Sequence, residues 1–237
     1  MKLQIKIIGL CLMAVATCAN AADDASKWNG LQIGISAGYG WAHSSTDVPV
    51  QAPFVATPAH FSLDGDGAIY GGNVGYDYAV NPNLVVGLAL DFAKTDISGS
   101  SCFDLVGCSG ASGDSYGSGE IDWLATFRGK AGIPYQNALF YVTGGYALAR
   151  LDSQDTHLFG TLDTPSHSNQ THDGWTAGAG VDYLIKQNIS VGIKYLYVDL
   201  GEEKYKYLSP VILPGSGISA NTSLDLHVLQ FSLNYKF

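Results

Sequence analysis

The C-terminal end of the chain constrains its fold more than any other feature. Apolar side chains occupy alternate positions up to the last residue, namely Leu229, Phe231, Leu233, Tyr235 and Phe237, and polar side chains fill the positions between them. A period of two places the apolar set on one face of a β-strand and the polar set on the other. Such a strand is suited to a barrel that has lipid outside and a polar interior.

Seven earlier segments alternate in the same way. They run from Leu31 to Trp41, Ala68 to Val80, Leu84 to Phe92, Ile121 to Tyr135, Phe140 to Leu148, Trp175 to Tyr183 and Ile189 to Tyr197. The second, fourth and sixth segments are followed by short turns and the others by connections of about twenty residues, an asymmetry typical of transmembrane barrels. The sequence therefore predicts an all-β fold, an eight-stranded antiparallel up-and-down transmembrane β-barrel with both termini on the periplasmic side.

Aromatic residues provide an independent test of this fold. They fall at the outer ends of the strands (Trp41, Tyr70, Phe92, Trp123, Tyr146, Trp175 and Tyr197) and at the inner ends (Tyr78, Tyr135, Tyr183, Tyr235 and Phe237). Amphipathic rings gather in two such belts where a barrel meets lipid headgroups. The main alternative is a soluble lipocalin-like barrel or sandwich with its apolar face inward, whose outer surface would carry too little charge to stay soluble.

The last strand contains one irregularity. Leu224, Leu226 and Val228 lie out of phase with the apolar set that begins at Leu229. A β-bulge inserts one extra residue and changes the face on which the following side chains lie. We therefore expect a bulge near His227 or Val228.

The N-terminal segment has the features of an export signal. Lys2 and Lys6 flank the start of an apolar stretch, which ends before the small-x-small sequence Ala19-Asn20-Ala21. We expect residues 1–21 to be a signal peptide and residues 22–237 to form a single barrel domain in the outer membrane of a Gram-negative bacterium. Removal of the two lysines leaves 12 − 2 = 10 basic against 21 acidic residues, a net charge of −11. Nucleic acid is excluded as a partner because its binding requires basic residues that neutralise phosphates.

Two cysteines remain after the signal peptide is removed. Cys102 and Cys108 are separated by five residues in the second long connection. An oxidising compartment favours a disulfide between them. A zinc site would need more ligands nearby, so we expect no metal site.

The predicted interior carries charges of both signs. The inward charged residues are Asp91, Asp122, Arg128, Lys130, Asp182 and Lys194. Eight strands enclose a space about wide enough to be filled by side chains, whereas a general porin needs about 16 strands. Unpaired buried charges are costly, so the mixture predicts an ion-paired plug. The alternative is an ion path lined by the same charges.

Most histidines fall in the predicted external loops. These are His43, His60, His157, His167 and His172. Histidine is a common ligand of metals and haem, so hemin capture by the loops is an alternative function. The spacing lacks the i, i+4 helical pattern of a strong metal motif, and polar loop composition is the simpler explanation. We therefore expect no resident cofactor.

Catalysis on a barrel of this kind would require Ser, His and an acid to converge. The triplet His43-Ser44-Ser45 has a suitable composition but is expected in a loop rather than on a strand. Asp64-Gly65-Asp66-Gly67 lacks the later Glu ligand of an EF-hand and is expected to be a turn that leads into the second strand. We therefore expect that the protein is not an enzyme.

Several segments resemble a known family of outer-membrane proteins. They are the signal peptide, the first-strand sequence Trp28-Asn29-Gly30-Leu31-Gln32-Ile33-Gly34, the sequence Gly174-Trp175-Thr176-Ala177-Gly178-Ala179-Gly180-Val181-Asp182-Tyr183 and the ending Leu233-Asn234-Tyr235-Lys236-Phe237. The mature chain is similar to the opacity-like group of small outer-membrane surface antigens, which includes hemin-binding members. The resemblance implies that Leu233, Tyr235 and Phe237 form the C-terminal signal for the barrel-assembly machinery.

The expected function follows from this architecture. Function on rigid scaffolds usually resides in their loops. We predict a porin-like fold with a structural and surface-antigen role, surrounded by outer-membrane lipid, whose external loops contact host or environmental ligands. A hemin-binding surface receptor and a small-solute porin are the alternatives.

Overall fold

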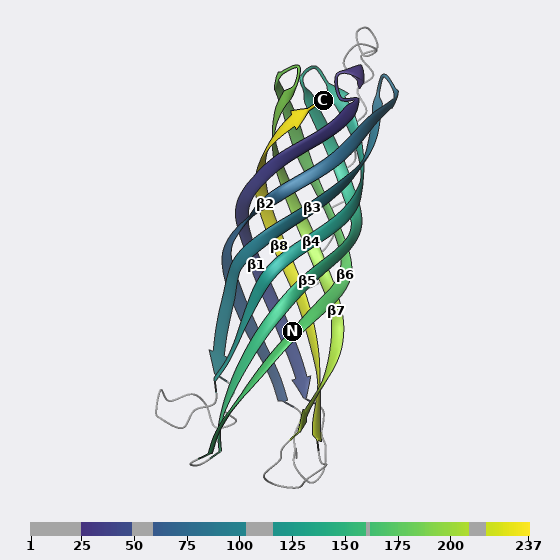
Figure 1. The fold of residues 1–237 in the computed structure, drawn as a ribbon. Coiled ribbons are helices and arrows are strands. Elements are labelled where there is room, and N and C mark those ends of the chain that lie inside the picture. The colour runs from purple at the N-terminus through teal and green to yellow at the C-terminus, as the bar shows by residue number, and fades with distance from the viewer. Residues whose placement is uncertain (1–24, 49–58, 103–115, 160–161, 209–216) are drawn as a thin grey trace, which may run out of the picture.

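The computed structural model describes residues 25–48, 59–102, 116–159, 162–208 and 217–237. Eight strands form one closed barrel, in which each strand pairs antiparallel with its neighbour in sequence and β8 closes against β1 (Figure 1). The strands are β1 (Gly30–Val48), β2 (Ala59–Asn81), β3 (Leu84–Cys102), β4 (Tyr116–Tyr135), β5 (Ala138–Phe159), β6 (Leu162–Lys186), β7 (Ile189–Leu208) and β8 (Gly217–Lys236). The predicted fold class is confirmed.

Three tight turns join strands at the end of the barrel where the C-terminus lies, at the top of Figure 1. They occupy residues 82–83, 136–137 and 187–188. One of them places Gln136 at a φ of 55°, in the left-handed region. The predicted positions of the short turns are therefore correct.

The strands are longer than predicted. They contain between 19 and 25 residues, whereas a transmembrane strand needs about 9–11. They take up much of the sequence expected in long loops, including Asp64-Gly65-Asp66-Gly67, which lies inside β2 rather than in a turn. Continued pairing satisfies the backbone N–H and C=O groups of these polar segments, so the barrel extends well beyond the lipid.

The outward face carries the predicted apolar side chains. Ile35, Phe92 and Trp175 are 67%, 55% and 51% exposed, as expected for residues that meet lipid in a membrane. Rings of the outer belt also contact one another across strands, with centroid distances of 5.8 Å for Phe92–Trp123 and 5.5 Å for Trp175–Tyr197. The outward apolar face rules out the soluble alternative with an apolar interior and a polar coat.

The predicted bulge in β8 is wrong. Residues 221–236 of β8 pair with β1 in one unbroken register. Leu224, Leu226 and Val228 are buried on the inward face of the barrel. The expectation failed because it assumed a polar interior over the whole length of the barrel.

A register shift occurs instead in β4, between Ile121 and Trp123. It turns Ile121 inward, where the side chain is 2% exposed, although simple alternation from Trp123 places it on the lipid face. The extra residue at this shift is Asp122. A bulge of this kind changes which side chains reach the interior.

A helical turn at residues 25–28 precedes β1. The Trp28 backbone N–H donates to the Ala25 carbonyl at 3.1 Å, and both side chains are buried. Within the described ranges, no helix is long and apolar enough to cross a membrane.

Candidate functional site

The barrel interior is divided into polar and apolar layers along its axis, and the inward side chains of one strand, β7, show this division. Starting from the end of the barrel that holds the C-terminus, the buried inward residues of β7 are Ser190 and Lys194, followed by Leu196, Val198 and Leu200. The same change from polar to apolar occurs on β4, where Lys130 and Arg128 precede Leu124 and Ile121. The interior therefore contains a polar layer that is covered by apolar side chains on the side away from the C-terminus.

Asp91 on β3 is the centre of one group of ion pairs. Its carboxylate accepts from the Arg128 guanidinium at 2.5 Å and also from the Lys194 ammonium. Arg128 is held further by the hydroxyl groups of Thr126 and Thr143, each 3.1 Å from a guanidinium nitrogen. Every charge in the group therefore has a partner of opposite sign, which buried charges require.

Lys130 on β4 is the centre of a second group. Its Nζ lies 2.7 Å from the Asp77 carboxylate and 3.5 Å from that of Asp182. Gln32 donates to Asp77 at 3.2 Å, and the ammonium lies 4.9 Å from the centroid of the Tyr141 ring. The two groups contain three carboxylates and three cations, so the ion-pair layer is electrically balanced.

The ion-pair layer consists of Asp77, Asp91, Arg128, Lys130, Asp182 and Lys194. Five of these residues were predicted to face inward. Asp77 was missed, although alternation places it on the inward face, because its two neighbours in the strand, Tyr76 and Tyr78, point outward. The placement of Asp122 was wrong, because the shift in β4 leaves it 39% exposed and 3.7 Å from Arg150, outside the layer.

Apolar layers close the interior on both sides of the ion pairs. The outer apolar layer contains Ile69, Ile97, Ile121, Leu124, Leu196, Val198, Leu200, Leu224, Leu226 and Val228. The inner apolar layer, at the end of the barrel that holds the tight turns and the C-terminus, contains Ala25, Trp28, Val85, Leu139, Tyr141 and Leu184. Trp28 reaches the inner layer from the helical turn before β1 and is 3% exposed. Buried apolar side chains therefore lie on both sides of the ion pairs, and at the inner end they are joined by buried polar residues such as Ser190 and Asn234.

Beyond the outer belt, β1 and β2 present a row of paired polar side chains, which we call the outer polar face. Its opposed pairs are Asp47 with His60, Ser45 with Ser62, and His43 with Asp64. His60 Nδ1 lies 2.7 Å from Asp47, and His43 Nδ1 lies 2.5 Å from Asp64. The second nitrogen of His43, Nε2, lies 3.3 Å from Ser45 Oγ. The triplet His43-Ser44-Ser45 is thus on a strand, not in a loop as predicted.

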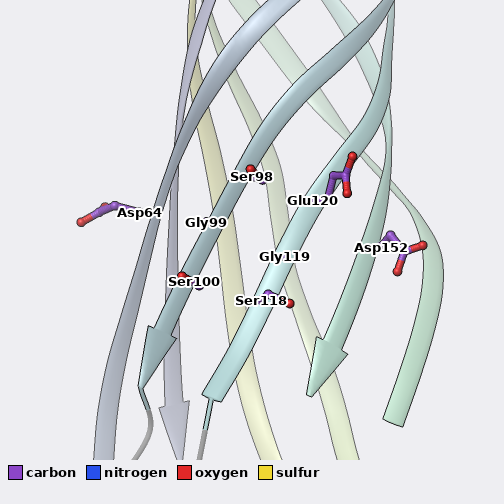
Figure 2. Close-up of a pocket in the computed structure, with 8 residues that line it drawn as sticks. All are labelled: Asp64, Ser98, Gly99, Ser100, Ser118, Gly119, Glu120 and Asp152. Carbon is purple, nitrogen blue, oxygen red and sulfur yellow. The ribbon is translucent and has the colours of Figure 1, made fainter. Parts of the chain in front are cut away.

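A polar hollow of about 510 Å³ lies beside this face, where β2 to β5 extend past the belt (Figure 2). Figure 2 shows Asp64 of β2 at one side, Asp152 of β5 at the other, and Glu120 of β4 between them. The remaining lining residues are Ser98, Gly99, Ser100, Ser118 and Gly119. Carboxylates and hydroxyl groups of this kind bind hydroxylated ligands by hydrogen bonds and repel anions.

The histidines considered for hemin lie on strands and not in loops. They are His43 on β1, His60 on β2, His157 on β5, and His167 and His172 on β6. His43 and His60 are each engaged with a carboxylate, and His172 is buried inside the barrel. The side chains of the other two fall outside the described part of the structure. Among the described residues, no three His, Cys, Asp or Glu side chains are grouped to hold a metal ion.

Two predictions concern parts of the chain that the structure does not describe. The signal peptide, residues 1–21, lies entirely outside the described ranges, and so do Cys108 and the side chain of Cys102. Export with cleavage near Ala21 and the Cys102–Cys108 disulfide therefore remain predictions.

Comparisons with known proteins agree with this architecture. Residues 8–237 match the family model described as outer membrane protein beta-barrel domain. The 31 kDa outer-membrane immunogenic protein of Brucella melitensis biotype 1 is 28% identical over 220 residues, which cover 90% of this chain and 85% of the relative. The 22 kDa outer membrane protein of Rhizobium leguminosarum bv. viciae is 32% identical over 100 residues, which cover 40% of this chain and 44% of the relative.

A solved structure shows the same kind of fold. The outer membrane protease OmpT from Escherichia coli aligns with a TM-score of 0.51 at 10% sequence identity, covering 89% of this chain and 97% of that protein. At this identity, the similarity concerns the fold alone. The family model and the named relatives thus place the chain in the outer membrane.

Proposed function

The chain belongs to the family of outer-membrane proteins with a β-barrel domain, and from this premise we propose that it is a closed, non-conducting scaffold that presents the outer halves of its strands at the cell surface. The layered interior is the observation that supports this proposal most strongly. The role requires no catalytic step and no cofactor.

A conducting path would have to cross three layers in series. Water or ions would need to pass the inner apolar layer around Trp28, the balanced ion pairs, and the outer apolar layer around Leu196 and Leu226. Apolar constrictions exclude water and therefore block ions. The packed interior supports an ion-paired plug over the ion path and over a small-solute porin.

The outer halves of the strands are suited to contact with partners outside the cell. They carry exposed polar side chains, such as Ser98 on β3 and Glu202 on β7, on a paired backbone. The name of the Brucella relative, an immunogenic protein, supports exposure at the surface. At the other end, the outward side chains of Leu233, Tyr235 and Phe237 support recognition of β8 by the barrel-assembly machinery.

Labelling of intact cells tests the proposed orientation. In a background in which Cys102 and Cys108 are replaced by serine, Glu202→Cys places a thiol on the outer half of β7 and Asn137→Cys places one in a periplasmic turn. A membrane-impermeant maleimide should label the first variant in intact cells and the second only after the cells are broken. Labelling of Asn137→Cys in intact cells, or protection of Glu202→Cys, would contradict the orientation.

Electrical recordings test closure separately. The purified protein in planar bilayers should show no stable openings at either polarity. Reproducible, long-lived openings would refute the closed scaffold and favour the porin alternative.

A further inference from the structure

On the outer polar face, an acid, a histidine and a serine contact one another in the same sequence of contacts as the catalytic residues of serine hydrolases. Asp64 Oδ1 contacts His43 Nδ1 at 2.5 Å, and Ser45 Oγ lies 3.3 Å from His43 Nε2. An acid on one ring nitrogen and a hydroxyl on the other is the arrangement that activates a serine nucleophile. We propose that Ser45, His43 and Asp64 form a hydrolase site that cleaves acyl esters of outer-leaflet lipids. This activity goes beyond the scaffold role.

The strand geometry holds these groups together. His43 and Ser45 are two positions apart on β1, so both side chains lie on the outward face. Asp64 is the direct partner of His43 on β2, and opposed residues in an antiparallel pair have Cβ atoms about 5 Å apart. The arrangement therefore rests on two paired strands rather than on chance convergence of loops.

The depth of the site defines its substrate class. Trp41 belongs to the outer aromatic belt and is 45% exposed, and His43 is the next outward residue along β1. The belt marks the boundary between acyl chains and headgroups. Ser45 is the following outward residue, on the headgroup side of this boundary, so the ester carbonyl groups that join acyl chains to a lipid headgroup are the lipid electrophiles nearest to it.

The adjacent hollow favours one kind of headgroup. Asp64 borders both the hydrolase site and the hollow, whose lining includes Glu120 and Ser98. Carboxylates and hydroxyl groups bind the hydroxyl groups of a sugar or glycerol, whereas they disfavour a phosphate placed among them. The preferred substrate is therefore an acyl ester whose polar part at the hollow is rich in hydroxyl groups.

The reaction needs only water as a second reactant. Ser45 Oγ attacks the ester carbonyl carbon, and its proton passes to His43 Nε2. The carbon–oxygen bond to the alcohol then breaks, the alcohol leaves with the proton from His43, and the acyl chain remains on Ser45. A water molecule gives a proton to His43 as its oxygen attacks the acyl carbon, and the fatty acid leaves as Ser45 recovers its proton. Asp64 is a positioning residue, because it acts through His43.

The test uses the full-length mature protein refolded in vesicles that contain a diacylated glycolipid. Release of fatty acid is measured by mass spectrometry, and an alkyl fluorophosphonate probe reports covalent reaction at serine. The wild type should release fatty acid and carry the probe on Ser45. Ser45→Ala and His43→Gln should lower the rate by at least about 100-fold, the usual contribution of a nucleophile's general base.

Two matched controls isolate the site from the fold. Ser44→Ala changes the neighbouring serine, which faces inward, and Ser62→Ala changes the serine opposite Ser45 on β2. Both controls should keep the wild-type rate within about twofold. All variants should show the same heat-modifiable migration on gels, which reports a folded barrel.

Asp64 provides a readout that a purely structural role would not affect. Asp64→Asn should lose most of the hydrolysis, whereas Asp64→Glu, which keeps a carboxylate, should restore a measurable part of it. No release of fatty acid by the wild type, or equal rates in the wild type and Ser45→Ala, would overturn the proposal. These results would leave the conductance and labelling tests of the scaffold unaffected.

Discussion

Neutralisation of Asp91 tests whether charge balance stabilises the barrel. The Asp91 carboxylate lies between Arg128 and Lys194, and the three side chains are no more than 9% exposed. Asp91→Asn keeps the shape of the side chain but leaves three cations against two carboxylates in the ion-pair layer. A second substitution, Lys194→Met, returns the layer to two charges of each sign.

The structure sets the expected magnitudes. Removal of one partner from a buried ion pair typically costs 3–5 kcal/mol, so Asp91→Asn should lower the free energy of unfolding by about 4 kcal/mol. The addition of Lys194→Met should recover about 1–2 kcal/mol, because coupled neighbours show interaction energies of this size. Asp122→Asn, in the exposed pair with Arg150, should cost less than about 1 kcal/mol.

The assay is reversible urea unfolding of the protein in lipid vesicles, followed by tryptophan fluorescence and by heat-modifiable migration on gels. The reasoning is refuted if Asp91→Asn costs no more than Asp122→Asn. It is also refuted if Lys194→Met adds to the loss caused by Asp91→Asn instead of reducing it. A buried cation that has lost its carboxylate destabilises the folded state, so its removal should restore part of the stability.

Three further predictions follow from the same architecture. Leu90→Arg places a charge on the lipid face and should cost about 2–4 kcal/mol of unfolding free energy, whereas Ser98→Arg, beyond the belt, should cost almost nothing. Mass spectrometry of the mature protein should find Cys102 and Cys108 oxidised, and their replacement by serine should change barrel stability by no more than about 2 kcal/mol; two free thiols would contradict the disulfide. Deletion of Phe237 should reduce the amount of folded barrel in the outer membrane while the purified variant still refolds in detergent, and unchanged assembly in cells would count against the C-terminal signal.

Alternation in the sequence assigned the faces of the strands correctly, except at Ile121 and Asp122 of β4 and at the outer half of β8. Residues such as Ile35, Phe92 and Trp175 could be assigned to the lipid face because a strand repeats every two residues and lipid tolerates only apolar side chains there. The inward positions of Asp91, Arg128 and Lys194 followed from the same period. These assignments need no knowledge of which strands pair.

Features that depend on pairing were not predictable in this way. The outer halves of the strands contain Gly, Ser and Asp, which is also the composition of loops, so the sequence alone does not show that they are paired. The shift that moves Asp122 out of the interior depends on how β4 fits β5, and a single strand carries no signal for it. The contact of His43 with Asp64 likewise depends on the register of β1 against β2.

The composition of the interior was only half predicted. Polar and charged residues were expected along the whole interior, so a bulge was predicted in β8 to move Leu224, Leu226 and Val228 to the outward face. An eight-stranded barrel has an interior that side chains can fill, and apolar side chains fill it as well as ion pairs do. The three leucine and valine side chains are therefore part of the outer apolar layer, with no break in β8.

Fluorescence quenching by brominated lipids tests whether the apolar face meets lipid while the interior is sealed from it. Two variants are compared, and in each of them all tryptophans but one are replaced by phenylalanine. One variant keeps Trp175, in the outer belt. The other keeps Trp28, which lies in the inner apolar layer and is 3% exposed. In vesicles of brominated lipid, the fluorescence of Trp175 should be strongly quenched and that of Trp28 should be almost unchanged. Equal quenching of the two, or quenching of Trp28 alone, would contradict the account.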